Sequence, residues 1–491
     1  MKIFITSHCY FPSASSGIPA TIEVCSSTGL VTAIHRNVRK SREEYPHVND
    51  EDFIHVADQY WLLPGLVDAH VHLNEPGRTE WEGFATGTAA AASGGVTTVV
   101  DMPLNAIPPT TTVDHLLQKV EAAKGQCRVD CAFYGGVIPG NQGDLVPLAN
   151  GGVKGFKCFL IESGVDEFPC VNEEQVLLAM PKLVVSPLSS PTKFPAFPAR
   201  KPDRCIPSPP RDPQEANSLF LFHAELDTPT VSPTTPSSPD SRSYSTFLSS
   251  RPPSLEESAI SLILRTARQH PSLRTHIVHL SAASAIPALR KARREERLKL
   301  SIETCFHYLV LTAEQISKGQ TLYKCCPPIR EAINRDALWK ALIEGDIDFV
   351  VSDHSPCVTE LKRLEEGDFM KAWGGIGGLG LGLSLLVTQG KRRGVGMERV
   401  LEWVCERPAR QVGLEASKGR IQVGGDADFV VFDPRKKFTV NKSELHFKNR
   451  SSPYEGLELE GAVIKTYLRG QLVYDREKGF KGIEPSGKLL L

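Results

Sequence analysis

Short runs of apolar and β-branched residues alternate with helix-like stretches through the middle of the chain. Helix-like stretches lie between several of the runs, at 113–124, 255–269, 282–297 and 335–345. Strands that alternate with helices form right-handed βαβ units around a parallel sheet. The pattern therefore predicts an α/β fold. The strand-like runs number eight, which favours a TIM-type (β/α)8 barrel over an open doubly wound sheet; they span 66–73, 96–102, 130–137, 153–160, 219–226, 275–281, 300–306 and 347–354.

Both ends of the chain lie outside this repeat and have the pattern of short β elements. Residues 1–62 begin with a strand-like segment, and residues 418–491 alternate strand-like runs with glycine-rich turns. We expect the two ends to pair into one small β domain beside a metal-dependent barrel of residues 63–417.

Two stretches inside the barrel range, at about 181–213 and 228–253, are dense in proline and follow neither the helix nor the strand period. Proline cannot donate to a strand ladder or sit comfortably inside a helix, so both stretches are predicted to be irregular. The helix after the fourth strand is expected to begin near 171–175 and to end around Pro181. Residues 184–213 interrupt this helix rather than extend a loop. We therefore favour a translated non-coding segment of the gene model over a disordered surface excursion.

Ionisable side chains stand at the carboxyl ends of four of the predicted strands. His70 and His72 end the first strand, and alternate residues of a strand share one face. His223, His279 and Asp353 end three later strands. The carboxyl ends of the strands form the mouth where barrel active sites lie, and neutral imidazoles on one face suit a divalent metal. One such residue is explained as a hydrogen-bonded core group, but five at the same edge indicate a metal site.

Two further ionisable residues lie inside predicted barrel strands. Asp68 shares the face of His70 and His72 and is expected to orient one of their rings. Lys157 lies in the middle of a strand, where burial favours the neutral amine. A neutral amine beside a metal ion can take up carbon dioxide and become a bridging carbamate. The alternative is a lysine whose ammonium reaches the barrel rim, and spacing alone does not decide between the two.

Composition excludes several classes of protein. The formal net charge is -1, with 41% hydrophobic and 23% charged residues, which gives no electrostatic argument for binding nucleic acid or a membrane surface. No run approaches about 18 apolar residues, and no secretion signal is recognisable. The 12 cysteines are scattered and are expected to be reduced thiols. We expect a cytoplasmic enzyme with a small-molecule substrate.

Several ordered blocks of sequence resemble the signatures of allantoinases, a family within the amidohydrolase superfamily. The resemblance runs from about residue 55 to 475 and leaves out the two proline-rich stretches. A series of blocks in the same order is more specific than any single motif. The blocks are HVHLNEPGRTEWEGF at 70–84, GFKCF at 155–159, KCCPPIR at 324–330, VSDHSPC at 351–357 and KAWGGI at 371–376.

The resemblance implies hydrolysis of the hydantoin ring amide of allantoin to allantoate. It also implies a homotetramer in which each chain has two divalent metal ions. Zn²⁺ is expected first, although iron, cobalt and manganese also suit such ligands. The resemblance further implies that His70, His72 and Asp353 hold one ion. His223 and His279 hold the other, and carboxylated Lys157 bridges both with a hydroxide. Asp353 is also implied to be the general base.

Smaller clues concern the substrate. Dihydroorotases, which resemble this family, carry arginine where this chain has Asn74, so a neutral ring without a carboxylate is expected. Asn105 is a second candidate contact, with a turn-forming role as its alternative. Cys326, which stands where serine is common, is expected to offer backbone groups. Dihydropyrimidinase, hydantoinase and dihydroorotase activities remain as alternatives. A non-catalytic scaffold is disfavoured because all six ligand positions are filled.

Overall fold

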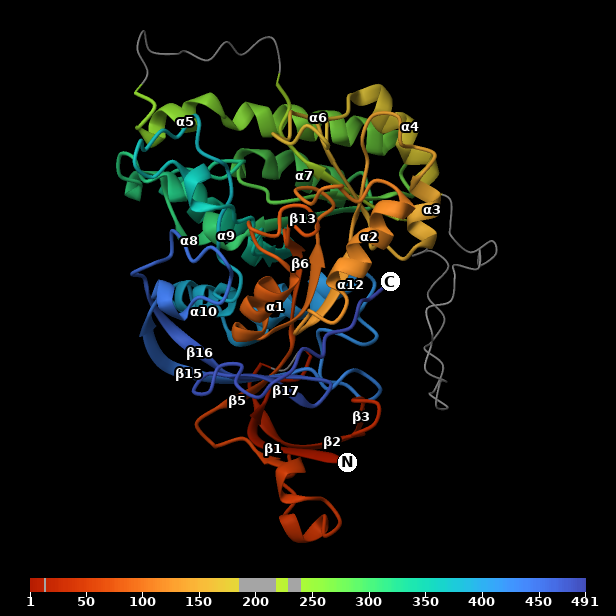
Figure 1. Ribbon diagram of the computed structural model, residues 1–491, viewed down its shortest axis with the longest axis vertical. Coiled ribbons are helices and arrows are strands. Elements are labelled where there is room, and N and C mark those ends of the chain that lie inside the picture. The colour runs from red at the N-terminus through yellow and green to blue at the C-terminus, as the bar shows by residue number, and fades with distance from the viewer. Residues whose placement is uncertain (13–14, 185–217, 228–239) are drawn as a thin grey trace.

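The computed structural model describes residues 1–12, 15–184, 218–227 and 240–491. A barrel with surrounding helices forms the larger part of the molecule, and a β domain made from both ends of the chain lies below it in Figure 1. The predicted α/β barrel with a small β domain is confirmed. The proposed boundaries between the two domains stay a prediction.

Parallel strands close into the barrel in sequence order. The strands β6, β7 and β8 pair with one another, and β9 to β14 form a second run of parallel neighbours. Tyr134 alone separates β8 from β9, so these two segments form one barrel strand, and a bridge between Val71 and His354 joins the last strand to the first. The bounds are β6 (Leu66–Val71), β7 (Val96–Asp101), β8 (Asp130–Phe133), β9 (Gly135–Gly136), β10 (Phe156–Phe159), β11 (Leu219–His223), β12 (Arg274–Ile277), β13 (Leu300–Cys305) and β14 (Phe349–Val351).

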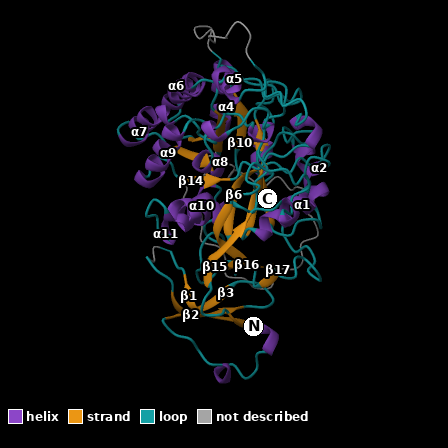
Figure 2. Ribbon diagram, turned by 90° about the vertical axis from the view of Figure 1, so that its left-hand side faces the viewer, coloured by secondary structure: helices purple, strands orange, loops and turns teal. Residues whose placement is uncertain are grey.

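A helix follows each barrel strand and covers its outer side, as Figure 2 shows with strands inside and helices around them. The helix α2 begins where the Thr112 hydroxyl accepts a hydrogen bond from the His115 amide at 3.2 Å, a common N-cap. These helices are α1 (Phe84–Ser93), α2 (Val113–Ala123), α3 (Leu145–Asn150), α4 (Glu173–Val184), α6 (Pro253–Gln269), α7 (Ile286–Arg294), α9 (Ala332–Glu344) and α10 (Gly382–Lys391). Shorter helices are α5 (Tyr244–Ser250), α8 (Phe306–Val310), α11 (Met397–Leu401) and α12 (Arg407–Gln411).

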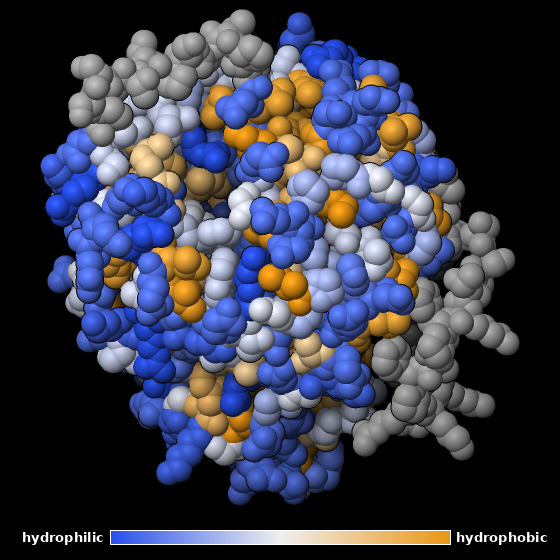
Figure 3. All heavy atoms as spheres, turned by 45° about the horizontal axis from the view of Figure 1, so that its top comes forward, coloured by the Kyte–Doolittle hydropathy of each residue, from blue (hydrophilic) through white to orange (hydrophobic). Residues whose placement is uncertain are grey.

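The surface of the molecule agrees with this layering. Hydrophilic side chains cover most of the face in Figure 3, and apolar residues lie there in separate groups. Within the described ranges, no helix combines the length and the apolar character needed to cross a membrane.

Two expectations about the proline-rich stretches are corrected. The helix α4 continues through Pro181 to Val184, because a proline in the last turn removes one amide donor while Leu183 remains buried. The second stretch, predicted to be irregular throughout, contains a helix in its last part. No proline lies between 240 and 251, and α5 forms there with Tyr244 and Phe247 buried on one face. The remaining insert, residues 185–213, lies outside the described residues.

Strands from both chain ends share one sheet in the β domain, in the order β17-β16-β15-β5-β1-β2-β3, with β4 pairing to β1. Phe4 from the N-terminal strand packs edge-on against Phe429 and Tyr467 from the C-terminal strands, with ring centroids 4.9 and 5.1 Å away. Aromatic packing therefore joins the two ends of the chain. The bounds are β1 (Lys2–Cys9), β2 (Ile18–Val24), β3 (Val31–Arg36), β4 (Phe53–His55), β5 (Trp61–Pro64), β15 (Phe429–Thr439), β16 (Glu458–Leu468) and β17 (Gln471–Asp475).

A buried ion network connects the β domain to the barrel. The Lys418 ammonium lies 2.6 Å from Asp130 at the start of β8, 2.7 Å from Asp426 and 2.8 Å from Asp428. Burial alone would lower the pKa of Lys418, but the three carboxylates raise it above its usual value. Arg469 adds a second cation, 2.6 Å from Asp130. The Lys418 ammonium thus pairs with carboxylates from both domains.

Replacing this lysine tests how strongly the network holds the two domains together. We expect Lys418→Met to lower the free energy of unfolding by about 3–5 kcal/mol, because the buried carboxylates would lose their central cation. Chemical denaturation measures the change. Lys391→Met is the control, since the Lys391 side chain is 66% exposed and pairs with Glu460 at the surface. Equal, small losses in both variants would contradict a structural role of the network.

Candidate metal centre

The six candidate ligands lie together at the carboxyl ends of the barrel strands. His70 lies in β6, His72 directly after it, and Lys157 inside β10. The exposed fractions of the candidates are all small: His70 1%, His72 7%, Lys157 1%, His223 4%, His279 3% and Asp353 7%. The strands therefore bring these side chains into one buried cluster.

One part of the cluster contains His70, His72 and Asp353. The Nε2 atoms of His70 and His72 lie 3.2 and 3.4 Å from the same carboxylate oxygen, Asp353 Oδ1. One ligand atom from each of the three residues lies within 4.8 Å of the others, which suits a common metal ion. His70 Nδ1 lies 2.5 Å from Glu303 Oε1 and donates to it, so the lone pair of Nε2 is left for a metal.

The other part contains His223 and His279. His223 Nδ1 lies 3.0 Å from His279 Nε2, while His223 Nε2 donates to Glu225 Oε2 at 2.7 Å. Glu225 thereby fixes the tautomer that leaves His223 Nδ1 free to bind a metal. The rings of His279 and His70 lie 5.6 Å apart, so the two parts of the cluster are neighbours.

Lys157 has an unusual environment for a lysine. Its Nζ is buried, and it has no hydrogen-bond partner among the residues that the structure describes. Burial lowers the pKa of this amine to about 8. Buried polar groups are nearly always paired, so a buried amine of this kind needs a further partner or a chemical modification. An amine with its pKa lowered toward neutral pH, beside four histidines and a carboxylate, fits a binuclear metal centre with a carbamate ligand.

Glu303 holds several ligands in place, although the strand-end pattern did not single it out. Besides His70, its carboxylate accepts a hydrogen bond from His276 Nε2 at 3.0 Å and one from the His279 amide at 3.3 Å. Burial alone would raise the pKa of Glu303, but His70 and His276 lower it to about 2. A charged residue inside an apolar strand was the available signal, the same one that marked Lys157.

The role expected of Asp68 is corrected. The Asp68 carboxylate accepts backbone hydrogen bonds from His70 and Ser352, each at 3.3 Å, and it does not orient a ring of the histidine pair. It instead joins the first and last barrel strands. The ring-orienting contact comes from Glu303 in β13, which is separated from β6 by β14 alone.

Left-handed backbone conformations are concentrated around the cluster. Asn74, Asn105, His279 and Asp353 have φ values of 63°, 71°, 40° and 44°. Asparagine tolerates this region through its short polar side chain, whereas histidine rarely adopts it. Non-glycine residues in this region are often found at active sites, where the surrounding structure holds them. The turns after the strands therefore aim the side chains into the mouth.

The three candidate substrate contacts occupy different sides of the cluster. Asn105 Nδ2 lies 3.3 Å from His72 Nδ1, and Asn74 Nδ2 donates to the Pro356 carbonyl at 3.3 Å. Asn74 Oδ1 is buried and, within the described residues, unpartnered. Cys326 is half-buried; burial raises the pKa of its thiol, and Arg251, which binds Glu225 at 2.5 Å, partly offsets this rise. The structure therefore places Asn105 beside His72 and Cys326 near the Glu225–Arg251 pair.

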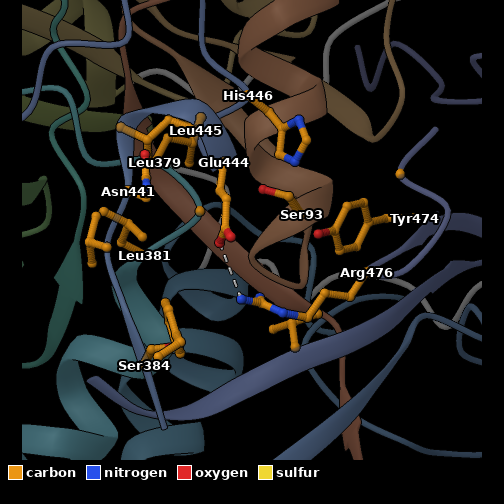
Figure 4. A pocket seen from close by; sticks show the side chains of 15 residues that line it. Ser93, Leu379, Leu381, Ser384, Asn441, Glu444, Leu445, His446, Tyr474 and Arg476 are labelled. Carbon is orange, nitrogen blue, oxygen red and sulfur yellow. Dashed lines mark ion pairs between the residues drawn. The ribbon is translucent and has the colours of Figure 1, made fainter. Parts of the chain in front are cut away.

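A separate pocket of about 240 Å³ lies between the end of α1 and the strands β15 to β17. Figure 4 shows His446, Tyr474 and Ser93 around it, and the ion pair between Glu444 and Arg476 at 3.6 Å. None of the candidate ligands lines this pocket. The chemistry indicated by the sequence therefore belongs to the strand-end cluster.

Comparison with known proteins gives consistent results. The model of the amidohydrolase family matches residues 61–167 and 258–473. The chain is 49% identical to an allantoinase of Saccharomyces cerevisiae over 88% of this chain and 86% of that protein. It is 39% identical to an allantoinase of Arabidopsis thaliana over 94% and 86% of the two chains. The solved structure of an L-hydantoinase (dihydropyrimidinase) from Arthrobacter aurescens superimposes with a TM-score of 0.82 at 26% identity, covering 100% of both chains.

Replacing Glu303 tests whether it supports a metal site. We expect Glu303→Gln to weaken divalent metal binding by about 10- to 100-fold, because a neutral amide with one carbonyl oxygen cannot fix both His70 and His276. Competition with a chelator measures the affinity, and circular dichroism checks the fold. Glu173→Gln, which changes a surface ion pair, is the control. Unchanged metal affinity in Glu303→Gln would show that this carboxylate does not support the ligands.

Proposed function

The chain belongs to the amidohydrolase family and, within it, to the allantoinases, and we propose that it hydrolyses a ring amide bond of allantoin to give allantoate. The observation that supports this most is the buried cluster of four histidines, one aspartate and an unpartnered lysine at the barrel mouth. Hydrolysis of an unactivated amide needs an activated water, and this set of donors is suited to providing one.

The donor set supports two ions rather than one. His70, His72 and Asp353 would hold the first ion, and His223 and His279 the second. His70 would bind through Nε2, opposite its contact with Glu303, and His223 through Nδ1, opposite its contact with Glu225. Lys157 as a carbamate would supply oxygen ligands to both, and zinc suits the mixture of nitrogen and oxygen donors. When bound, such ions supply a hydroxide at neutral pH and polarise the ring carbonyl.

Asp353 is the residue that moves the proton. Its carboxylate accepts the proton released by the attacking water and then donates it to the amide nitrogen as the carbon–nitrogen bond breaks. Asp353 Oδ1 faces the Nε2 atoms of His70 and His72, so the base stands beside the ligands of the first ion. The left-handed turn at Asp353 holds the carboxylate in this direction.

The neutral character of the candidate contacts supports a neutral ring as substrate. Asn74 and Asn105 are uncharged, and the nearby cations are already engaged: Arg251 with Glu225 at 2.5 Å, and Arg78 with the Asn105 carbonyl at 3.1 Å and Glu167 at 3.9 Å. A substrate carboxylate would therefore be buried without a cation of its own, which is costly. Allantoin has no carboxylate. The homotetramer and the cytoplasmic location implied by the family resemblance stay predictions.

A comparison of three ring substrates tests the proposed function. With added divalent metal, we expect kcat/KM for allantoin to exceed that for dihydrouracil by about 10²-fold. Dihydroorotate should be the poorest substrate, because Arg251 and Arg78, the described cations near the candidate contacts, are already engaged. Ring opening is followed by product formation, and bound metal is measured in parallel. A protein that carries its full metal and prefers dihydrouracil or dihydroorotate would contradict the proposed function.

Replacing Lys157 tests the bridging carbamate. We expect Lys157→Ala to lose nearly all activity and part of its bound metal, and small carboxylic acids to restore part of both by supplying the missing oxygen ligands. Activity and metal content are measured with and without acetate or propionate. Lys182→Ala, at an exposed position of α4, is the control. Full activity of Lys157→Ala without any added acid would exclude the bridging role.

A further inference from the structure

His307 is a buried histidine whose two ring nitrogens have no hydrogen-bond partner among the described residues. It lies in α8, directly after β13, and therefore at the same edge of the barrel as the candidate ligands. Its exposed fraction is 0%. A neutral imidazole offers one donor and one acceptor, and buried polar atoms of this kind are nearly always paired.

The position of His307 indicates where a partner would lie. One of its ring nitrogens is within 4.8 Å of an Asp353 carboxylate oxygen and of Cys305 Sγ, yet forms no hydrogen bond with either. A polar atom of a bound molecule can therefore contact both His307 and Asp353. Asp353 is the proposed proton donor to the amide nitrogen, so that amide is the group that must stand there.

Two other roles fit the surroundings less well. A third metal ion on Cys305, His307 and Asp353 would need a thiolate, but burial raises the pKa of Cys305 well above its usual value. A structural role for the polar atoms of His307 is also disfavoured, because they bind no described residue. The structural hydrogen bond in this turn comes from Tyr308, whose hydroxyl donates to the Pro327 carbonyl at 2.7 Å. The Tyr308 ring packs edge-on against His307 with centroids 4.1 Å apart, and so fixes the imidazole without bonding its nitrogens.

We propose that His307 is a further catalytic residue, which hydrogen-bonds the scissile amide of the substrate beside Asp353. This inference rests on the proposed function. His307 keeps its own proton throughout. The proton that reaches the departing nitrogen comes from Asp353, the new carbon–oxygen bond forms to the attacking hydroxide, and the carbon–nitrogen bond breaks. His307 contributes by holding the amide in the position from which Asp353 can protonate it.

Three substitutions of one residue test this role. His307→Leu removes both polar atoms, His307→Asn keeps a polar atom near the position of Nδ1, and His307→Gln keeps one near that of Nε2. We expect kcat/KM for allantoin to fall by about 10²-fold in His307→Leu. One of the two amide variants should regain about 10-fold, and it thereby identifies the nitrogen that contacts the substrate. Metal content and thermal midpoint should stay unchanged in all three.

His446→Leu is the matched control, because His446 is a half-buried histidine of the separate pocket in Figure 4. It should leave kcat/KM unchanged. His307→Leu with kcat/KM within about two-fold of the unsubstituted chain would overturn the proposal. Loss of metal or of folded protein in all three His307 variants would overturn it in favour of a ligand or structural role.

Calorimetric titration with allantoin separates a failure of this inference from a failure of the proposed function. If the metal-loaded chain opens none of the three test rings, the proposed function fails, and the titration still decides the role of His307. Binding to His307→Leu that is about 10-fold weaker than to the unsubstituted chain supports the contact. Equal binding, or no binding to either protein, overturns it.

Discussion

Closure of the barrel is the constraint on which the candidate centre depends. The last strand meets the first through the bridge between Val71 and His354, and the His72 amide donates to the His354 carbonyl at 2.8 Å. Asp68 reinforces the seam by accepting from the Ser352 amide. Because these contacts fix the register of the two strands, Asp353 comes to lie beside His70 and His72, far away in the sequence. A slip of one residue would turn its carboxylate away from both rings.

The same region shows how a protein keeps several ionisable groups buried. Glu303 is stabilised as a carboxylate by His70 and His276, and Glu225 by His223 and Arg251. Each carboxylate thus has two nitrogen partners and determines which nitrogen of a candidate ligand keeps its lone pair. Lys157 and His307 differ from this arrangement, because their polar atoms have no such partners within the described residues. Buried polar groups are nearly always paired, so these two residues support the proposed carbamate and the proposed substrate contact.

Much of the fold and of the candidate cluster could be predicted from the sequence. Strand period and the position of polar residues at strand ends depend only on local geometry, which is why His223 and His279 were found. The roles of Glu303 and Asp68 depend on which strands lie near one another in the closed barrel. Local sequence patterns contain no such information. The helix α5 was missed because the prolines before it dominated the composition of its stretch. The interpretation of the insert at 184–213 as part of a gene-model error stays a prediction.

A buried cation, Lys362, connects two loops beside the candidate substrate contact Cys326. Lys362 is 5% exposed and donates to the carbonyls of Lys324, Trp373 and Gly375, at 3.2 Å and 3.0 Å for the first two. Lys362 therefore connects the segment 324–326 to the segment 373–375. A Cβ at Gly374 would stand 3.1 Å from Cys326 Sγ, so the two segments are in close contact. Three carbonyl oxygens accept the hydrogen bonds of this ammonium, so its three donors are used within the protein, which agrees with an uncharged ring as substrate.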